Sequence, residues 1–291
     1  MICHLCPRDC GALRTEQEGQ GRCAMPALPK LARAALHHWE EPPISGTRGS
    51  GTIFFSGCPL QCVFCQNSTI SWEGYGKTVT VDRLREICRD LVGQGAHNLN
   101  FVSPTHYAHV VRQVLQEPMG VPIVWNTGGY ESLETLRAME GLVDVYLPDL
   151  KYLDPATAAR YSNAPDYPER ATAAIREMVR QVGPVQLDEE GILQKGVIIR
   201  HLILPGQLRG AKAVMDWVAE NFQPGEVLFS LMCQYVPLGR AADYREINRP
   251  LRKAEARSAI AYMENLGLEG FTQDLTAASA GYVPRFDLTG L

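Results

Sequence analysis

Short apolar runs alternate with amphipathic helical patterns along most of this chain, beginning at residue 51. The run 51–55 is continuously apolar after its first residues, which is typical of a buried strand. Thr80 can then cap a helix that Gly93 and Gly95 bring to an end. The apolar positions of this helix fall at i, i+3, i+4, i+7 and i+8, and they are Leu84, Ile87, Cys88, Leu91 and Val92. Because Cys88 lies on this apolar face, we expect it to be a core residue.

The same alternation continues to residue 266 and predicts the fold. Six strand–helix units favour an α/β fold with a parallel sheet and helices on its outside. Right-handed crossovers close such units into a barrel or partial barrel, with the chemistry at the carboxyl ends of the strands. We predict strands at 51–55, 98–103, 121–126, 143–147, 196–204 and 226–232, and further helices at 107–116, 132–139, 155–161, 168–182, 211–221 and 252–266.

The pattern also divides the chain into three parts. We assign 1–50 to a cysteine-rich metal-binding extension and linker, 51–275 to the barrel and 276–291 to a C-terminal tail. Residues 270–274 fit a last strand, and the tail after them is interpreted as an ordered coil or a lid. Pro42 and Pro43 predict an extended linker into the first strand.

Four cysteines distinguish the N-terminal segment. Cys3, Cys6, Cys10 and Cys23 follow the spacing C-x2-C-x3-C-x12-C, with glycines between the later members. Four soft ligands complete a tetrahedral zinc site or hold an iron–sulfur cluster. Free thiols or a disulfide segment are the alternatives, and the compactness of the first three ligands favours iron–sulfur slightly over zinc. His37 and His38 follow this segment, and we expect them to be partly buried or surface residues and not ligands.

A second set of cysteines lies directly after the first predicted strand. Cys58, Cys62 and Cys65 are spaced C-x3-C-x2-C in one loop, so their sulfurs can converge on one small metal centre. Soft sulfur ligands select zinc, copper(I) or an iron–sulfur cluster. Three cysteines leave one position of a four-ligand site unfilled, and an iron–sulfur cluster would keep one iron open. A zinc loop and three unrelated core cysteines are the alternatives.

These cysteines match the cluster motif of the radical S-adenosylmethionine (SAM) superfamily, and Phe64 matches the aromatic residue before its last cysteine. The stretch 40–67 resembles the pyruvate formate-lyase activating enzyme-like branch, which makes Gln66 and Asn67 candidate cofactor contacts. The resemblance implies an open (β/α)6 partial barrel, a 4Fe-4S cluster, and SAM bound to the open iron. It also implies one-electron cleavage of SAM to a 5′-deoxyadenosyl radical that abstracts hydrogen. The N-terminal block resembles the start of one radical SAM subgroup.

Polar residues follow the third and fourth predicted strands, where a barrel would place its ligands. Asn126, Thr127 and Gly128 follow the third strand; the glycine allows close approach by a ligand, although a tight turn explains it equally well. By resemblance, Asn126 replaces an aspartate that helps to hold a monovalent cation near SAM. Asp149 and Lys151 alternate after the fourth strand and point to one face. From the sequence alone, a surface ion pair explains the two residues equally well. Their match to the SAM-binding segment of the family implies contacts with the ribose and the methionyl carboxylate.

The fifth and sixth strands supply further candidates. Arg200 lies in an otherwise apolar strand, where an arginine needs an anionic partner, and the resembling enzymes carry an arginine here that faces SAM and the radical centre. His201 should point to the opposite face as a packing residue. Tyr235 or Gln234 replaces a histidine that contacts SAM in the activating enzymes. Cys233 could donate a hydrogen atom, but an isolated thiol is more often a core residue.

The segment after the second strand departs most from the family. The superfamily usually has Gly-Gly-Glu there, and this chain has Ser103-Pro104-Thr105-His106. Ser103 and Thr105 can accept a hydrogen bond from the SAM ammonium group but provide no charge. His106 could be a general base or a substrate contact, or simply a residue at a helix start.

Composition limits the classes of partner and the location. The net charge of −4 gives no basic field for nucleic acid or an anionic membrane. No apolar run approaches a membrane span, and the N-terminus has no signal-peptide pattern. Nine cysteines in a chain of this length are typical of metal ligands in a reducing compartment, so we expect a cytoplasmic protein.

Three functions remain in competition. The first is an activating-enzyme-like protein that generates a glycyl or other radical on a protein partner. The second is a radical SAM enzyme that modifies a small molecule or peptide. The third is a noncatalytic metal-binding interaction module, which Asp149, Lys151 and Arg200 argue against. For either enzyme the resemblance implies a low-potential electron donor such as flavodoxin or ferredoxin.

Overall fold

The computed structural model describes residues 1–273 and 284–291. Ten of the described strands form one sheet in the order β12-β11-β10-β8-β7-β6-β4-β3-β5, with β9 paired to β10. Neighbouring strands from β4 to β12 in this order run parallel, whereas β3 pairs antiparallel with β4 and β5. The strands are β3 (Lys30–His37), β4 (Ser50–Phe55), β5 (Lys77–Thr78), β6 (Leu99–Val102), β7 (Ile123–Thr127), β8 (Val145–Pro148), β9 (Gln186–Leu187), β10 (Leu193–Leu202), β11 (Leu228–Met232) and β12 (Gly270–Thr272).

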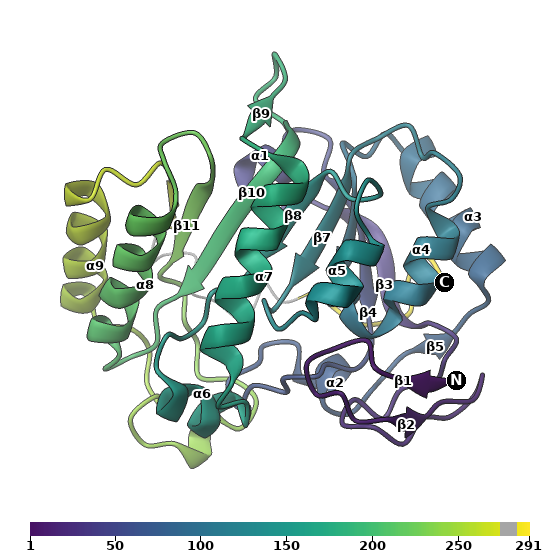
Figure 1. The fold of residues 1–291 in the computed structure, drawn as a ribbon, viewed down its shortest axis with the longest axis horizontal. Helices are drawn as coiled ribbons and strands as arrows, with labels where there is room; N and C mark the ends of the chain where they lie inside the picture. Colours follow the sequence, from purple (N-terminus) through teal and green to yellow (C-terminus); the bar gives the residue numbers. More distant parts are fainter. Residues whose placement is uncertain (274–283) are drawn as a thin grey trace.

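The sheet is open at both ends, and helices cover one face of it (Figure 1). This is the predicted α/β architecture, a partial barrel, and all six predicted strands and the last strand are confirmed. The helices are α1 (Pro42–Ser45), α2 (Ser68–Ser71), α3 (Val81–Gly93), α4 (Ala108–Val114), α5 (Leu133–Ala138), α6 (Pro155–Ser162), α7 (Tyr167–Val182), α8 (Leu208–Asn221) and α9 (Lys253–Asn265).

Helix α3 illustrates how the sequence sets an element. The Thr80 side chain accepts a hydrogen bond from Arg83 N at 3.1 Å, which caps the helix as predicted. Leu84, Ile87 and Cys88 are all buried against the sheet. Cys88 is therefore a core residue.

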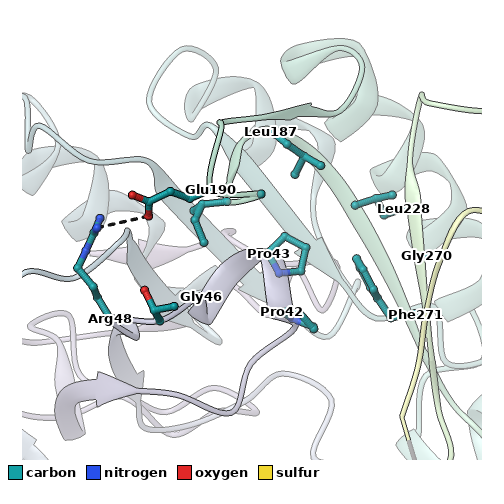
Figure 2. A pocket seen from close by; sticks show the side chains of 12 residues that line it. Pro42, Pro43, Gly46, Arg48, Leu187, Glu190, Leu228, Gly270 and Phe271 are labelled. Carbon is teal, nitrogen blue, oxygen red and sulfur yellow. Dashed lines mark ion pairs between the residues drawn. The ribbon is translucent and has the colours of Figure 1, made fainter.

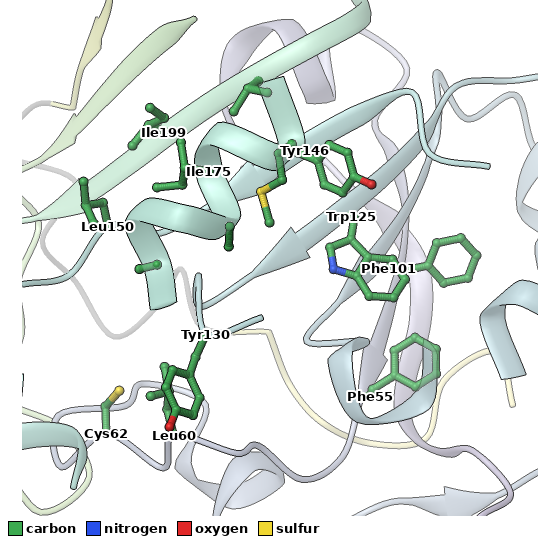
Figure 3. Close-up of a cluster of buried hydrophobic side chains, with 14 of the residues drawn as sticks. Phe55, Leu60, Cys62, Phe101, Trp125, Tyr130, Tyr146, Leu150, Ile175 and Ile199 are labelled. Carbon is green, nitrogen blue, oxygen red and sulfur yellow. The ribbon is translucent and has the colours of Figure 1, made fainter. Parts of the chain in front are cut away.

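The main core lies between the sheet and its helices. Side chains alternate along each strand, and Phe55, Phe101 and Trp125 on neighbouring strands all face the helical layer. Ile175 of α7 packs into the same cluster (Figure 3). Aromatic residues of this size bury large apolar areas and fix the sheet against its cover.

The inner face of the barrel has its own apolar cluster near the amino ends of the strands. Ile44 of α1 packs there against Val124, Val145 and Ile198, and all four side chains are fully buried. The amide of Asn98 donates to Ile44 O at 2.7 Å, which fixes α1 to β6. The base of the barrel is thus filled, and the space above it is left for polar groups.

One sequence expectation for residues 30–50 is wrong. Pro42 and Pro43 do not form an extended linker; they begin helix α1, because the fixed φ of proline suits the first turn of a helix. Lys30–His37, expected within the extension, is a strand of the main sheet. The proposed domain boundary at residue 50 stays a prediction.

The two ends of the chain attach to the barrel in different ways. The N-terminal segment forms a two-stranded antiparallel sheet, β1 (Ile2–Cys3) with β2 (Ala12–Leu13). The last residues lie beside β3, where Leu288 N donates to Ala32 O and Ala34 N to Thr289 O. Part of the predicted last strand and tail, residues 274–283, lies outside the described residues. No helix in residues 1–273 or 284–291 has both the length and the apolar character needed to cross a membrane.

Candidate active site

The loop that carries Cys58, Cys62 and Cys65 crosses the carboxyl ends of the parallel strands. It leaves β4 at Ser56, and Val63 N donates to Tyr161 O in α6 at 2.9 Å. A Cβ atom on Gly128, just after β7, would lie 3.0 Å from Leu60 in this loop. A side chain at Gly128 would therefore push the end of the Leu60 side chain aside, and the glycine allows β7 and the loop to pack closely. The cysteines lie at the mouth of the barrel, as the sequence predicted.

The three thiols are free and sit in a poorly solvated environment. Cys62 is buried, and Cys58 and Cys65 are half-buried. Cys62 Sγ accepts a hydrogen bond from Ser162 Oγ at 3.0 Å, and Cys65 Sγ accepts one from Ser71 Oγ at 3.2 Å. Burial raises the pKa of all three thiols, that of Cys65 to about 12. The thiols therefore hold their protons until a metal centre displaces them.

The loop fits an iron–sulfur cluster by its donor chemistry. Three soft donors lie in one buried loop, and two of them already receive hydroxyl hydrogen bonds of the kind that stabilise a metal-bound thiolate. Asn67 adds a buried Oδ1 atom without a hydrogen-bond partner at the end of the loop. Within residues 1–273 and 284–291, no three Cys, His, Asp or Glu side chains are gathered closely enough to form a finished metal site.

Aromatic packing supports the loop from behind. Phe64 makes edge contacts with the rings of Tyr161 and Tyr235, at centroid distances of 6.5 and 6.2 Å. Tyr235 is almost fully buried, and its hydroxyl donates to Ile247 O at 2.8 Å. Phe64 and Tyr235 thus hold the loop in place through packing. Next to Tyr235, Gln234 has a buried Oε1 atom without a partner.

The charged residues predicted from the fourth and fifth strands are brought together. Asp149 bonds Lys151 Nζ through Oδ2 at 2.6 Å and Arg200 Nε through Oδ1 at 2.9 Å. Arg200 Nη2 donates to Asn126 Oδ1 at 2.7 Å. The pKa of Asp149 is lowered although burial acts to raise it, because Arg200 and Lys151 stabilise its charge. Asp149, Lys151 and Arg200 are thus ionised at neutral pH and form one network on the inner face.

Two glutamates that the sequence analysis did not single out join this network. Glu40 Oε2 lies 3.4 Å from Arg200 Nη1, and Glu41 Oε1 accepts from Ser230 Oγ at 3.1 Å. Both side chains come from the segment just before α1 and reach the inner face of the barrel. The sequence signal that could have identified them is their position directly before Pro42 and Pro43. These prolines begin α1, and the residues at the start of this helix reach the inner face of the barrel.

The side chains of the segment after β6 form hydrogen bonds within the protein that the sequence analysis did not predict. The Thr105 hydroxyl donates to Glu131 at 2.5 Å, and Thr127 donates to the same oxygen. Ser103 adopts a left-handed conformation at φ 56°. Thr105 and Thr127 are thus committed to Glu131, a buried carboxylate that the sequence analysis missed.

His106 is buried and anchors the cluster loop. Its Nε2 atom lies 2.7 Å from Ser56 O, the first residue of the loop. Burial lowers the pKa of His106 to about 3, so the ring is neutral at physiological pH and donates this hydrogen bond. The geometry gives His106 a structural contact with the loop.

The N-terminal cysteines lie beside the same mouth. Cys3 and Cys6 are buried, Cys23 is half-buried and Cys10 is exposed. Gln61, in the loop between Cys58 and Cys62, donates through Nε2 to the carbonyl oxygen of Arg22, the neighbour of Cys23, at 3.2 Å. The two cysteine sets therefore lie on adjacent segments.

Two arginines hold this N-terminal segment against the barrel. Arg14 is 2% exposed; it donates to His106 O at 2.5 Å and stacks on Tyr107. Arg8 donates to Pro59 O in the cluster loop at 2.9 Å. Since each guanidinium joins the extension to residues at the mouth, the extension packs on the cluster loop.

The remaining predicted residues separate into exposed and packed groups. Gln66 is exposed at the end of the loop. Cys233 is fully buried in the main core, and His201 is buried with Nδ1 2.7 Å from Leu150 O, so both are packing residues. His37 is half-buried and His38 is exposed, as expected.

A separate cavity of about 660 Å³ opens at the other end of the barrel (Figure 2). It lies between α1, the β9–β10 hairpin and the starts of β11 and β12, and Arg48 and Glu190 form an ion pair of 3.5 Å at its rim. Barrels of this kind carry their chemistry at the carboxyl ends of the strands. The cavity lies at the amino ends, and neither the cysteines nor Asp149, Lys151 and Arg200 line it.

The chain belongs to the Radical SAM superfamily, whose family model matches residues 52–216. Family membership supports a 4Fe-4S cluster and SAM as cofactors, and reductive cleavage of SAM as the reaction class.

Three comparisons describe proteins to which the chain is similar. The uncharacterized protein MJ0674 of Methanocaldococcus jannaschii is 29% identical over 277 residues, covering 92% of this chain and 75% of that protein. A mutant form of spore photoproduct lyase is similar in structure with a TM-score of 0.51 and 13% identity, over 75% of each chain. Streptococcus suis SuiB, solved bound to S-adenosylmethionine, matches with a TM-score of 0.50 and 15% identity over 77% of this chain and 47% of that one. The chain thus spans about half the length of SuiB, and these structures support the fold alone.

Proposed function

We propose that this protein is an activating-enzyme-like radical SAM enzyme that generates a radical on a protein or peptide partner. The observation that carries the proposal is the position of three free, poorly solvated thiols beside the network of Asp149, Lys151 and Arg200 at one barrel mouth. The match of residues 40–67 to the activating-enzyme branch supports the choice of partner class.

In this proposal Cys58, Cys62 and Cys65 hold the cluster. When bound and reduced, the 4Fe-4S cluster supplies the electron that cleaves SAM to methionine and a 5′-deoxyadenosyl radical. The hydroxyls of Ser162 and Ser71 stabilise the sulfur charge by hydrogen bonds. Phe64 and Tyr235 keep the loop rigid from behind.

The charged network orients SAM. Lys151 binds its carboxylate and Asp149 its ribose hydroxyls by charge-assisted hydrogen bonds. Arg200 holds Asp149 in place through the ion pair of 2.9 Å. The resemblance to the activating enzymes implies that Arg200 would also face SAM. Of the other predicted contacts, Asn67 is favoured because its buried oxygen lacks a partner, and Gln234 is preferred to Tyr235 for the same reason. Contacts from Gln66, Ser103, Asn126 and Gly128 complete the proposed set, whereas the hydroxyls of Thr105 and Thr127, also expected to contact SAM, donate to Glu131.

We also propose a second metal centre at Cys3, Cys6, Cys10 and Cys23, either iron–sulfur or zinc. Its support is the four-ligand spacing together with the contact between Arg22, beside Cys23, and Gln61 in the loop of Cys58 and Cys62. Exposure of Cys10 gives a flavodoxin or ferredoxin an approach to this end of the molecule. Iron, sulfide and zinc analysis before and after Cys3→Ala/Cys6→Ala identifies the metal. An unchanged metal content in the double variant excludes the site.

The test of the proposed function is formation of 5′-deoxyadenosine. Anaerobically reconstituted protein with dithionite and SAM should produce it, and Cys62→Ala should abolish it because one cluster ligand is lost. Cys88→Ala is the matched control, since Cys88 lies in the core of α3, and it should retain the activity. Turnover that persists in Cys62→Ala would contradict the assignment. Absence of turnover in every form would favour the noncatalytic metal-binding module.

A second function, modification of a small molecule or peptide by the same radical, is favoured by the polar interior of the barrel. If a neighbouring gene encodes a glycyl radical enzyme, failure to place a radical on that enzyme in vitro would count for this alternative.

A further inference from the structure

The carboxylates inside the barrel outnumber the cations that face them. Asp149 takes both short ion pairs of the network, with Lys151 at 2.6 Å and Arg200 at 2.9 Å. Glu40 and Glu41 make only longer ion pairs with Nη1 of the same Arg200 guanidinium, at 3.4 Å from Glu40 Oε2 and 3.9 Å from Glu41 Oε2. Three carboxylates therefore share two cations, and the two glutamates are the poorly compensated members.

Both glutamates are removed from solvent, which makes this imbalance costly. The side chain of Glu40 is 11% exposed and that of Glu41 is 2% exposed. The two side chains also hydrogen-bond each other, and their remaining partners are neutral: Asn126 Nδ2 at 3.4 Å for Glu40, and Ser230 Oγ at 3.1 Å for Glu41. Buried charges in proteins are ordinarily paired. Burial raises the pKa of Glu40, and that of Glu41 to about 7, since Arg200 compensates only in part.

An independent feature of the same interior indicates a polar ligand. Asn100 is fully buried, and neither its amide nitrogen nor its amide oxygen has a hydrogen-bond partner. Its neighbours Leu99 and Phe101 face the helical layer, so Asn100 points into the barrel. Two residues before it, Asn98 also faces the barrel interior and binds α1. On the neighbouring strand β7, Asn126 lies two residues beyond the residue that pairs with Asn100, and it binds Glu40. An unsatisfied buried amide costs free energy unless a ligand or water pairs with it.

We propose that Glu40 and Glu41, with the amide of Asn100, bind a cationic nitrogen group of the substrate, an ammonium or a guanidinium. This inference rests on the proposed function, because it takes the barrel interior as the place where the substrate meets the radical. Apolar packing of Ile44 below the glutamates sets the floor of the site. A substrate with a lysine- or arginine-like group, free or within a peptide, matches this chemistry, whereas an anionic substrate group does not.

The experiment uses the reconstituted holoenzyme with SAM present, so that the cationic groups of SAM itself are already in place. Guanidinium at millimolar concentration is the probe and urea is its neutral isostere, and binding is followed by calorimetric titration. Guanidinium should give a saturable signal at least tenfold stronger than urea. Glu41→Gln and Asn100→Ala should each weaken it tenfold or more. Glu190→Gln, the same chemical change at the far end of the barrel, should leave it unchanged.

The two sources of the cation are then compared with L-arginine and an arginine-containing pentapeptide, each against its citrulline counterpart. Tighter binding of L-arginine than of citrulline indicates a free small-molecule substrate. Tighter binding of the arginine pentapeptide than of its citrulline form indicates a peptide substrate. Equal signals for guanidinium and urea in the wild type, or an unchanged guanidinium signal in both Glu41→Gln and Asn100→Ala, would overturn the inference. Formation of 5′-deoxyadenosine is measured in the same samples. Intact SAM cleavage without cation preference rejects this inference alone, and absent SAM cleavage rejects the proposed function.

Discussion

At the scale of single residues, the site depends on charges whose partners come from distant parts of the chain. Asp149 and Arg200 are 51 positions apart in sequence, yet they form an ion pair of 2.9 Å because β8 and β10 are neighbours in the sheet. Asp149 compensates two cations at once. Loss of its charge therefore leaves both Lys151 and Arg200 without their main partner.

We predict that Asp149→Asn weakens SAM binding at least tenfold and lowers the free energy of unfolding by about 3 kcal/mol, the usual cost of breaking a buried pair. Calorimetric titration with SAM and urea denaturation measure the two effects. Asp90→Asn, an exposed position on α3, is the control and should change neither. Wild-type affinity in Asp149→Asn would exclude Asp149 from the SAM site.

Glu131 predicts a pH dependence of stability. Burial raises the pKa of its carboxyl from 4.5 to about 7, so the folded protein keeps this proton where the unfolded chain has lost it. The folded state then binds more protons between these two pH values, and stability must fall as pH rises through that window. The difference corresponds to about 3 kcal/mol.

Urea denaturation at pH 5 and pH 8 measures this contribution as the difference between the wild type and Glu131→Gln, which keeps acceptors for Thr105 and Thr127. From pH 5 to pH 8 the wild type should lose about 3 kcal/mol relative to this variant. The contributions of Glu41, of the same sign, and of the buried His106, of the opposite sign, are common to both proteins. Glu134→Gln, an exposed neighbour, should retain the wild-type slope. The same slope in Glu131→Gln as in the wild type would assign the pH dependence to other groups.

At the scale of elements, the sequence predicts strands and helices correctly wherever the apolar residues repeat with a clear period. The parallel strands, and α3 with its Thr80 cap, follow from hydrophobic spacing alone. Short elements were not predicted, because the two-residue strands β1, β2, β5 and β9 are too short to show a repeat of apolar residues. Helix α1 was not predicted either, because its two prolines are compatible with an extended linker and with the first turn of a helix. Glu40 and Glu41 were missed together with it.

Helix α1 is expected to stabilise the barrel through Ile44, which is fully buried among Val124, Val145 and Ile198. We predict that Ile44→Ala lowers the free energy of unfolding by about 2–5 kcal/mol, because it leaves a cavity in the base. Chemical denaturation measures the loss. Ile2→Ala, at an exposed side chain, is the control and should cost little. A loss below that range in Ile44→Ala would mean that α1 does not pack as described.

At the scale of the whole molecule, the N-terminal extension and the barrel act as one structure. Arg14 donates to His106 O, and the ring of His106 binds Ser56 O, where the cluster loop begins. Thus a single chain of contacts connects the N-terminal cysteines to the loop of Cys58, Cys62 and Cys65. Sequence spacing identified both cysteine sets, but their adjacency depends on how the extension folds back over the mouth, which no local pattern encodes.

The most direct test of the central claim is the electron paramagnetic resonance spectrum of the dithionite-reduced, reconstituted protein with and without SAM. If SAM binds the cluster held by Cys58, Cys62 and Cys65, adding SAM should change the cluster signal. The Cys3→Ala/Cys6→Ala variant should keep that SAM-dependent change, and Cys62→Ala should lose it. A cluster signal that SAM leaves unchanged in the wild type, or a SAM-dependent change that survives in Cys62→Ala, would contradict the account.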